Sequence, residues 1–175
     1  MHAVPIPAAP SSRLQLTPLG GIARKPQQLL VLPSKEITWE KMTLTVDSGA
    51  PDTVVPPKFC SWSTIFHTEK VGTEYEVANG DVVHNMGERR CVMKVSEKSG
   101  ELNIAFQVVE VHKPLLAVSS ITAQGHQVIF ADKDDHILLS SGEKLPLRNV
   151  NGVFELDVWI KHDPAEDFRR QGLTR

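Results

Sequence analysis

Apolar and polar residues alternate strictly from Met42 to Val46, and this period of two predicts a β-strand with one buried face. The strand runs directly into Asp47-Ser48-Gly49-Ala50, which puts Asp47 at its end. A small hydroxyl residue followed by glycine lets the backbone turn sharply and lets a second backbone segment approach closely. The pattern therefore predicts a carboxylate presented at a turn, although an Asx turn between two strands has the same composition.

Further short strands are expected along the chain, separated by Gly, Asn, Asp and Ser residues. Residues 102–108 alternate in the same way, Asn79-Gly80 is typical of a tight hairpin turn with two left-handed residues, and a short helix is expected over 119–124, closed by Gly125. The remaining strands are expected at 91–95, 102–111, 127–131, 136–140 and 152–160. This spacing predicts an all-β domain with one brief helix.

The chain divides by composition into three parts. Residues 1–33 are rich in Pro, Ala and Ser and show no periodicity, which is typical of a flexible leader. Residues 34–161 carry the expected strands and form the expected globular domain, which ends in a C-terminal β extension. Residues 162–175 combine mixed charges with few apolar residues and are expected to be a polar tail or linker.

Composition narrows the classes of function. A chain of 175 residues with 41% hydrophobic residues can bury the core of one domain. With 19 Lys and Arg against 21 Asp and Glu, the net charge of −2 favours neither nucleic acid nor an anionic membrane as a partner. No apolar run approaches the roughly 18 residues of a membrane span, and the first residues lack the layout of a signal peptide. We therefore expect a cytoplasmic protein.

The cysteines and histidines do not follow a metal-binding pattern. Neither Cys-x2-Cys nor His-x3-His spacing occurs among the candidates, which are Cys60, His67, His84, Cys91 and His112. The acidic run at 132–135 lacks the glycine and the closing glutamate of a calcium loop and is expected to be a solvated turn. No metal and no cofactor are expected. The two cysteines are expected to be thiols in a reducing compartment, with one disulfide as the alternative.

From Lys41 to Gly125 the chain resembles the retropepsin-like aspartic proteases, and most of all the protease of copia-class retrotransposon polyproteins. Residues 47–50 are similar to the catalytic loop of that family, and residues 75–86 are similar to its flap. Residues 115–117 are similar to the apolar segment that precedes the short helix of the family. The resemblance implies a closed barrel with one lobe per chain.

The resemblance also implies roles for individual residues. In the family the aspartate of the loop binds and activates the attacking water, so Asp47 is the expected catalytic residue. The residues expected to support the active site are Ser48, Gly49, Leu115, Leu116 and Ala117. The residues expected to bind substrate are Ala50 and Asp52 in the loop and Ala78, Asn79 and Gly80 at the flap tip.

Peptide hydrolysis by carboxylates needs two of them, because one accepts a proton from water while the other, protonated, polarises the scissile carbonyl. The chain has one Asp-Ser-Gly motif, at Asp47, so the resemblance implies a homodimer with one catalytic aspartate per chain. The family's hydroxyls after each aspartate bond across the dimer, a role that falls to Ser48. The expected partner is an extended peptide, held between the loop and the flap as in β-strand addition.

Two departures from the family keep alternatives open. Ala117 replaces a glycine, and Pro51 and Val118 replace an acid and an arginine that form an ion pair in retroviral members. The joint loss of both charges can be nearly neutral, whereas the loss of one would strand the other. The first alternative is a catalytically inactive domain of the same fold that dimerises or binds extended peptides. The second is an unrelated β-barrel binding module in which Asp47 only caps a turn.

Overall fold

The computed structural model describes residues 36–164 of the chain, which lie in the second of its two units, Ser34–Arg175. The predicted leader, residues 1–33, and all but three residues of the predicted tail, 162–175, lie outside the described residues. In the described part no helix has the length and apolar character needed to cross a bilayer.

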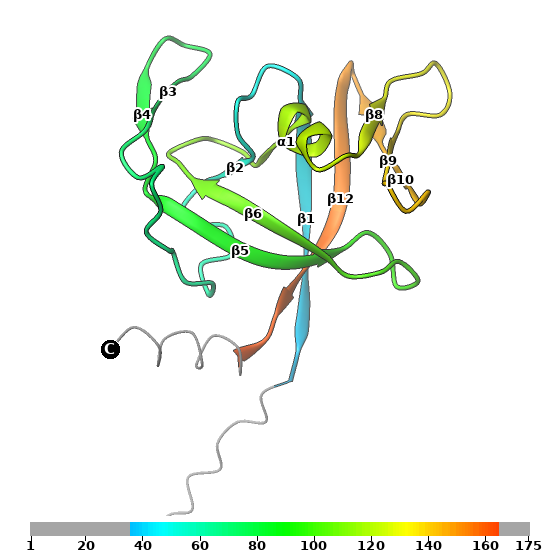
Figure 1. The fold of residues 1–175 in the computed structure, drawn as a ribbon, viewed down its shortest axis with the longest axis horizontal. Helices are drawn as coiled ribbons and strands as arrows, with labels where there is room; N and C mark the ends of the chain where they lie inside the picture. The colour runs from blue at the N-terminus through cyan, green and yellow to red at the C-terminus, as the bar shows by residue number, and fades with distance from the viewer. Residues whose placement is uncertain (1–35, 165–175) are drawn as a thin grey trace, which may run out of the picture. The chain divides into compact units, whose positions relative to one another are not determined.

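Residues 36–164 are mainly β-structure, which confirms the predicted all-β class (Figure 1). The helix is α1 (Val118–Ala123), one residue earlier than the expected position. The strands are β1 (Thr38–Asp47), β2 (Val54–Val55), β3 (Glu74–Glu76), β4 (Val82–His84), β5 (Gly87–Lys94), β6 (Leu102–Val108), β7 (Leu115–Ala117), β8 (Gln127–Ile129), β9 (His136–Leu138), β10 (Lys144–Pro146), β11 (Arg148–Val150) and β12 (Val153–His162).

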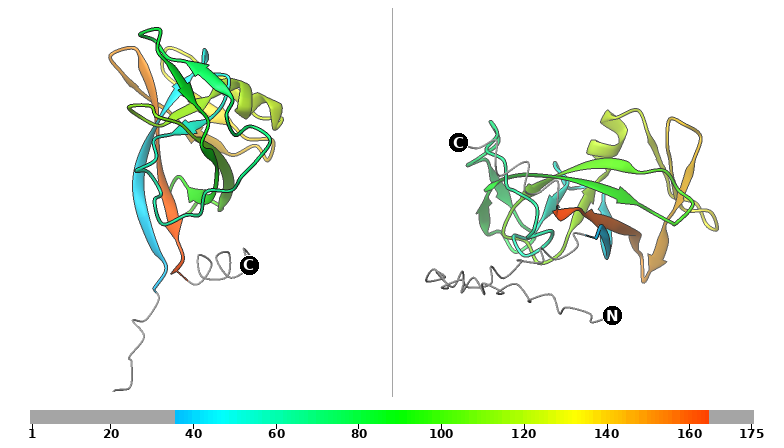
Figure 2. Two further views of the ribbon diagram at one scale, coloured as in Figure 1. Left: turned by 90° about the vertical axis from the view of Figure 1, so that its left-hand side faces the viewer. Right: turned by 90° about the horizontal axis from the view of Figure 1, so that it is seen from below.

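The main sheet has the strand order β1-β7-β2-β6-β5-β12-β11, and β1 also pairs with β12. Pairing therefore runs through six strands and returns to β1, so that each of these strands has a neighbour on both sides. The longest contact is the antiparallel pair of β1 and β12, from Thr38 opposite His162 to Thr45 opposite Glu155. The left view of Figure 2 shows these two strands side by side along their length.

Over part of β1 and of β12, every second side chain points into the core. Met42 and Leu44 of β1 are buried, as are Leu156, Val158 and Ile160 of β12, whereas the residues between them remain partly exposed. Burying an aliphatic side chain of this size contributes about 1.5–3 kcal/mol relative to exposure. Any shift of register by one residue would turn this face towards water, so the burial fixes how β1 and β12 pair.

Two smaller sheets stand apart from the main one. Strands β8, β9 and β10 form a three-stranded antiparallel sheet, and β3 and β4 form a two-stranded hairpin. The hairpin contains the predicted flap tip. Some strand bounds differ from expectation: β8 ends at Ile129 instead of residue 131, and β5 begins at Gly87 instead of residue 91.

The predicted geometry of the Asn79-Gly80 turn is wrong. Only Gly80 is left-handed, with φ +85°, because the strands separate after Glu76 and five residues, 77–81, form the loop. The Gly80 N–H bonds the Val77 carbonyl at 2.8 Å, which closes a tight turn before the left-handed glycine. The tight turn with two left-handed residues occurs instead at Asn151-Gly152, where φ is +55° and +84° and β11 joins β12.

Candidate functional site

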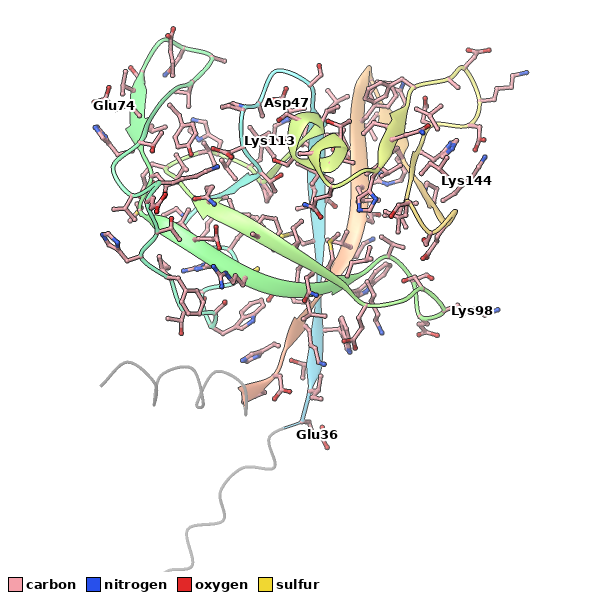
Figure 3. All side chains as sticks on the ribbon, viewed as in Figure 1. Glu36, Asp47, Glu74, Lys98, Lys113 and Lys144 are labelled. Atoms are coloured by element: carbon pink, nitrogen blue, oxygen red, sulfur yellow. The ribbon has the colours of Figure 1, made fainter. Side chains whose placement is uncertain are left out.

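Asp47 is the last residue of β1, as the alternating pattern predicted (Figure 3). Its carboxylate Oδ1 accepts a hydrogen bond from the Gly49 backbone N–H at 2.7 Å. The side chain is half-buried, while Ser48 and Gly49 are exposed. A Cβ atom on residue 49 would lie 3.4 Å from Asp47 Oδ1, an ordinary van der Waals contact, so a small side chain would fit there. The result is a fixed carboxylate at the end of a strand with an accessible face.

The apolar segment 115–117 lies directly beside this carboxylate. It forms β7, which pairs in parallel with β1 so that Leu115 is opposite Thr45, Leu116 is opposite Val46 and Ala117 is opposite Asp47. Leu116 and Ala117 are buried and form the support behind the loop. Ala117 has φ −71° and ψ 126°, ordinary extended geometry that alanine adopts without strain. Glycine is not required by the backbone at this position.

Two hydroxyl groups that the sequence did not single out fasten the loop after Asp47. Thr53 Oγ1 is buried and accepts the Ala117 backbone N–H at 3.1 Å. Ser119 Oγ, in the first turn of α1, lies 3.2 Å from the Ala50 carbonyl and 3.3 Å from the Pro51 carbonyl. Residues 48–53 are therefore held at both β7 and α1. Pro51 and Val118, which replace the charged pair of retroviral members, lie in this corner of the molecule. There the hydroxyls of Thr53 and Ser119 join the loop to β7 and α1.

Asp52 connects the loop to the β3–β4 hairpin. Its Oδ1 is 2.5 Å from Lys70 Nζ, and its Oδ2 accepts the Tyr75 hydroxyl at 2.9 Å. The hydrogen bond that Lys70 donates to Asp52 raises the pKa of Lys70, which keeps the ammonium charged beside the carboxylate. Both carboxylate oxygens of Asp52 thus have partners within the chain, and Asp52 orders the structure around the expected substrate position.

The predicted flap-tip residues Ala78, Asn79 and Gly80 are exposed and lie at the end of the hairpin. Figure 1 shows the hairpin rising at the same end of the strands as the loop after β1. Asn79 folds back on the loop, since its Oδ1 accepts the Asp81 N–H at 3.0 Å. Among residues 36–164 no hydrogen bond or ion pair joins these three residues to Asp47. The structure therefore brings Asp47 together with segments 48–52 and 115–117, and leaves the tip apart from them.

Cys60 and Cys91 are both buried thiols in the core, as one of the two sequence alternatives predicted. A hydrogen bond with Cys91, together with burial, raises the pKa of the Cys60 thiol far above its ordinary value. A thiol in this state is not a nucleophile at neutral pH. Within the described region no group of three or more His, Cys, Asp or Glu side chains is arranged to hold a metal ion.

The chemistry of the site is that of one carboxylate held by a backbone N–H, on a strand end with an open face. Such a group can accept a proton from water or a hydroxyl, or share a proton with a second carboxylate. A search against protein-family models, curated proteins and solved structures finds no match to this chain.

Proposed function

We propose that the chain is a retropepsin-like aspartic endopeptidase that is active as a homodimer and cleaves a retroelement polyprotein. The observation that carries this proposal is the carboxylate of Asp47, which ends β1, accepts the Gly49 N–H and lies opposite Ala117 of the parallel strand β7. In this reading the circuit of six paired strands is the closed barrel of the family. Asp47 holds the attacking water and accepts its proton.

The reaction needs a second carboxylate, which a second copy of the chain supplies. The half-buried Asp47 and the exposed Ser48 leave room for such a copy. The pairing of β1 and β12 ends at Thr45 opposite Glu155, two residues before Asp47 on β1 and two residues after Val153 on β12. Val153 and its pair partner Val150 are each 39% exposed, so apolar side chains are exposed at the turn between β11 and β12. Apolar surface of this kind favours association.

An extended peptide is the substrate that this arrangement fits. The loop after Asp47 and the β3–β4 hairpin rise at the same end of the main sheet (Figure 1). Backbone groups along both could pair with a substrate chain, as in other cases of β-strand addition. Asp47 then acts on the carbonyl carbon of the bound peptide through its activated water.

The departures from the family are compatible with activity. Ala117 has ordinary extended dihedral angles, and its N–H has a partner in Thr53 Oγ1. The corner that lacks the charged pair is held by Ser119, whose hydroxyl contacts the Ala50 and Pro51 carbonyls. Neither change leaves a buried charge without a partner.

The test compares Asp47→Asn with Asp132→Asn, a control at an exposed aspartate of the β8–β9 loop. Asparagine keeps the shape of the side chain but cannot accept and return a proton. We expect Asp47→Asn to lose all cleavage of casein with an unchanged circular dichroism spectrum, and Asp132→Asn to cleave as the wild type does. Undiminished cleavage by Asp47→Asn would contradict the proposal.

Pepstatin distinguishes the enzyme from its alternatives, because it mimics the tetrahedral intermediate between two carboxylates. We expect it to raise the melting temperature of the wild type by binding the folded dimer. A raised melting temperature without any cleavage would support the inactive peptide-binding domain. No shift and no cleavage would support a binding module in which Asp47 only caps a turn.

A further inference from the structure

The β3–β4 hairpin has little of its own to hold it in position. Each strand has three residues, and the two strands pair with no other strand of the described chain. Only the central residues, Tyr75 and Val83, are partly buried, while both of their neighbours on each strand are exposed. An isolated two-stranded hairpin of this length is marginally stable in water. Contacts at its base must therefore determine where it lies.

Tyr75 makes a polar side-chain contact at that base. Its hydroxyl donates to Asp52 Oδ2 at 2.9 Å and accepts from Asn85 Nδ2 at 3.2 Å. Asp52 belongs to the loop that follows Asp47, and its other oxygen is taken by Lys70. A hydrogen bond to a carboxylate is stronger than one between neutral groups. The Tyr75 hydroxyl thus joins the hairpin to the loop that follows the candidate catalytic residue.

Asn85 anchors the same contact to the main sheet. It is 2% exposed, and its amide donates to Gln107 Oε1 of β6 at 2.8 Å as well as to Tyr75. Its Oδ1 accepts the Gly87 N–H at 2.7 Å, so its side-chain donors and its acceptor are all occupied. Gln107 in turn donates to Glu88 Oε2 at 3.0 Å. A buried network in which every member has partners is rigid, and its end at Tyr75 is fixed.

We propose that Tyr75 is a positioning residue whose hydroxyl latches the β3–β4 hairpin to the loop after Asp47. Asp52 is the acceptor of this latch, and Asn85 holds the phenol in place from the side of the sheet. The latch itself stands on the contacts alone, whereas its effect on substrate binding rests on the proposed function. When the hairpin lifts to admit a peptide, the bond between Tyr75 and Asp52 is the one that must break.

Hydrogen exchange of the hairpin amides tests the latch without reference to activity. In the hairpin loop the Val77 and Gly80 N–H groups bond the Asp81 and Val77 carbonyls, so their exchange reports melting of the hairpin, which is marginally stable once its contact at the base is lost. In Tyr75→Phe, which keeps the ring and removes the hydroxyl, we expect exchange at both amides to be about tenfold faster. Rates within about twofold of the wild type in a folded variant would overturn the latch.

Ser99→Ala is a control that also removes one hydroxyl, but this hydroxyl accepts the Val95 and Ser96 N–H groups in the turn between β5 and β6. It should speed exchange of the Val95 and Ser96 amides and leave the hairpin unchanged. Faster exchange of the hairpin amides in this control too would show general loosening and would count against a specific latch.

A second readout uses the fact that Tyr75 is the single tyrosine of the chain, so phenol absorbance reports it alone. Burial raises the pKa of Tyr75, Asn85 opposes the rise, and the hydrogen bond to Asp52 adds to it. Asp52→Asn removes the charge from the acceptor, so the phenol should titrate at lower pH than in the wild type, while circular dichroism shows that the chain is still folded. An unchanged or raised titration midpoint would overturn the contact between Tyr75 and Asp52.

Kinetics then separate positioning from a general structural effect. For Tyr75→Phe we expect KM to rise about tenfold with kcat within about twofold, because part of the binding free energy is used to bring the hairpin into place. In the double variant Tyr75→Phe with Asp52→Asn, KM should stay as high as in Tyr75→Phe alone.

If the exchange and titration results hold but the wild type cleaves nothing, the latch stands and the proposed function fails. If the wild type cleaves and Tyr75→Phe has unchanged KM and exchange, the latch fails and the function stands.

Discussion

At the scale of single residues, hydroxyl groups hold the backbone around Asp47. Thr53 accepts the buried N–H of Ala117, and Ser119 reaches the Ala50 and Pro51 carbonyls. These contacts join segments that are 64 to 69 residues apart in the sequence. They hold Ala117, the residue of β7 opposite Asp47, in place relative to the loop that follows Asp47.

Removing the Thr53 hydroxyl should therefore cost stability at the site. Thr53→Val keeps the shape but leaves the Ala117 N–H unpaired in a buried position, and such a group costs about 1–3 kcal/mol. We expect the free energy of unfolding in urea to fall by about that amount. Thr53→Ser keeps the acceptor and is the control, with a smaller loss from the missing methyl group. Equal losses in the two variants would mean that the hydroxyl contributes nothing.

The sequence predicts the position of Asp47 but not the residues that hold it. Strict alternation before Asp47 and the Ser-Gly turn after it are local signals, and β1 ends where they indicate. Thr53, Ser119 and Tyr75 act through contacts that exist only once distant strands have paired, so no local pattern marks them. Tyr75 had one available signal, as the single tyrosine of the chain.

At the scale of elements, the β3–β4 hairpin is the part of the described chain best suited to move. It pairs with no other strand, and its tip residues are exposed. Its turn depends on Gly80, which has φ +85° and no atom within 4 Å of the place where a Cβ would lie, so only backbone strain opposes a substitution there. Gly142 between β9 and β10 has φ +88° and equally open surroundings.

These two glycines make a matched pair of variants. A β-branched residue in the left-handed region costs about 1–3 kcal/mol, so Gly80→Val and Gly142→Val should lose similar free energy of unfolding. Only Gly80→Val should lower kcat/KM strongly, because only its turn covers the expected substrate position. Equal kcat/KM in the two variants would mean that the β3–β4 hairpin is structural and does not act as a lid.

Elements with strong alternation follow the prediction, and turns follow it less well. The strands expected at 42–46 and 102–108 lie within β1 and β6. The need to bury the apolar side chains of a strand produces the alternation in the sequence and also determines how the strand pairs. Asn79-Gly80 does not adopt the predicted geometry because the length of the loop, which depends on where β3 and β4 stop pairing, selects the turn. Asn151-Gly152 adopts it because Val150 and Val153 pair directly around it.

At the scale of the whole molecule, the account depends on a second copy of the chain. One chain supplies one Asp-Ser-Gly motif, and hydrolysis by carboxylates needs two such groups close together. Two-fold symmetry through the region of Asp47 would bring both together from a single type of chain. In the described chain Asp47 is half-buried beside the exposed Ser48 and Gly49, and Val150 and Val153, around the turn between β11 and β12, are each 39% exposed.

Subunit exchange between the wild type and Asp47→Asn tests this central claim most directly. When equal amounts are mixed and allowed to exchange, random pairing leaves about a quarter of the dimers with two Asp47 carboxylates, and half of the wild-type chains sit in hybrids. A hybrid has one carboxylate facing one amide and should be nearly inactive. Cleavage per wild-type chain should then fall to about half of its value before mixing, and sedimentation should show dimers throughout. Unchanged cleavage per wild-type chain after complete exchange, or a sedimenting monomer that still cleaves, would contradict the account.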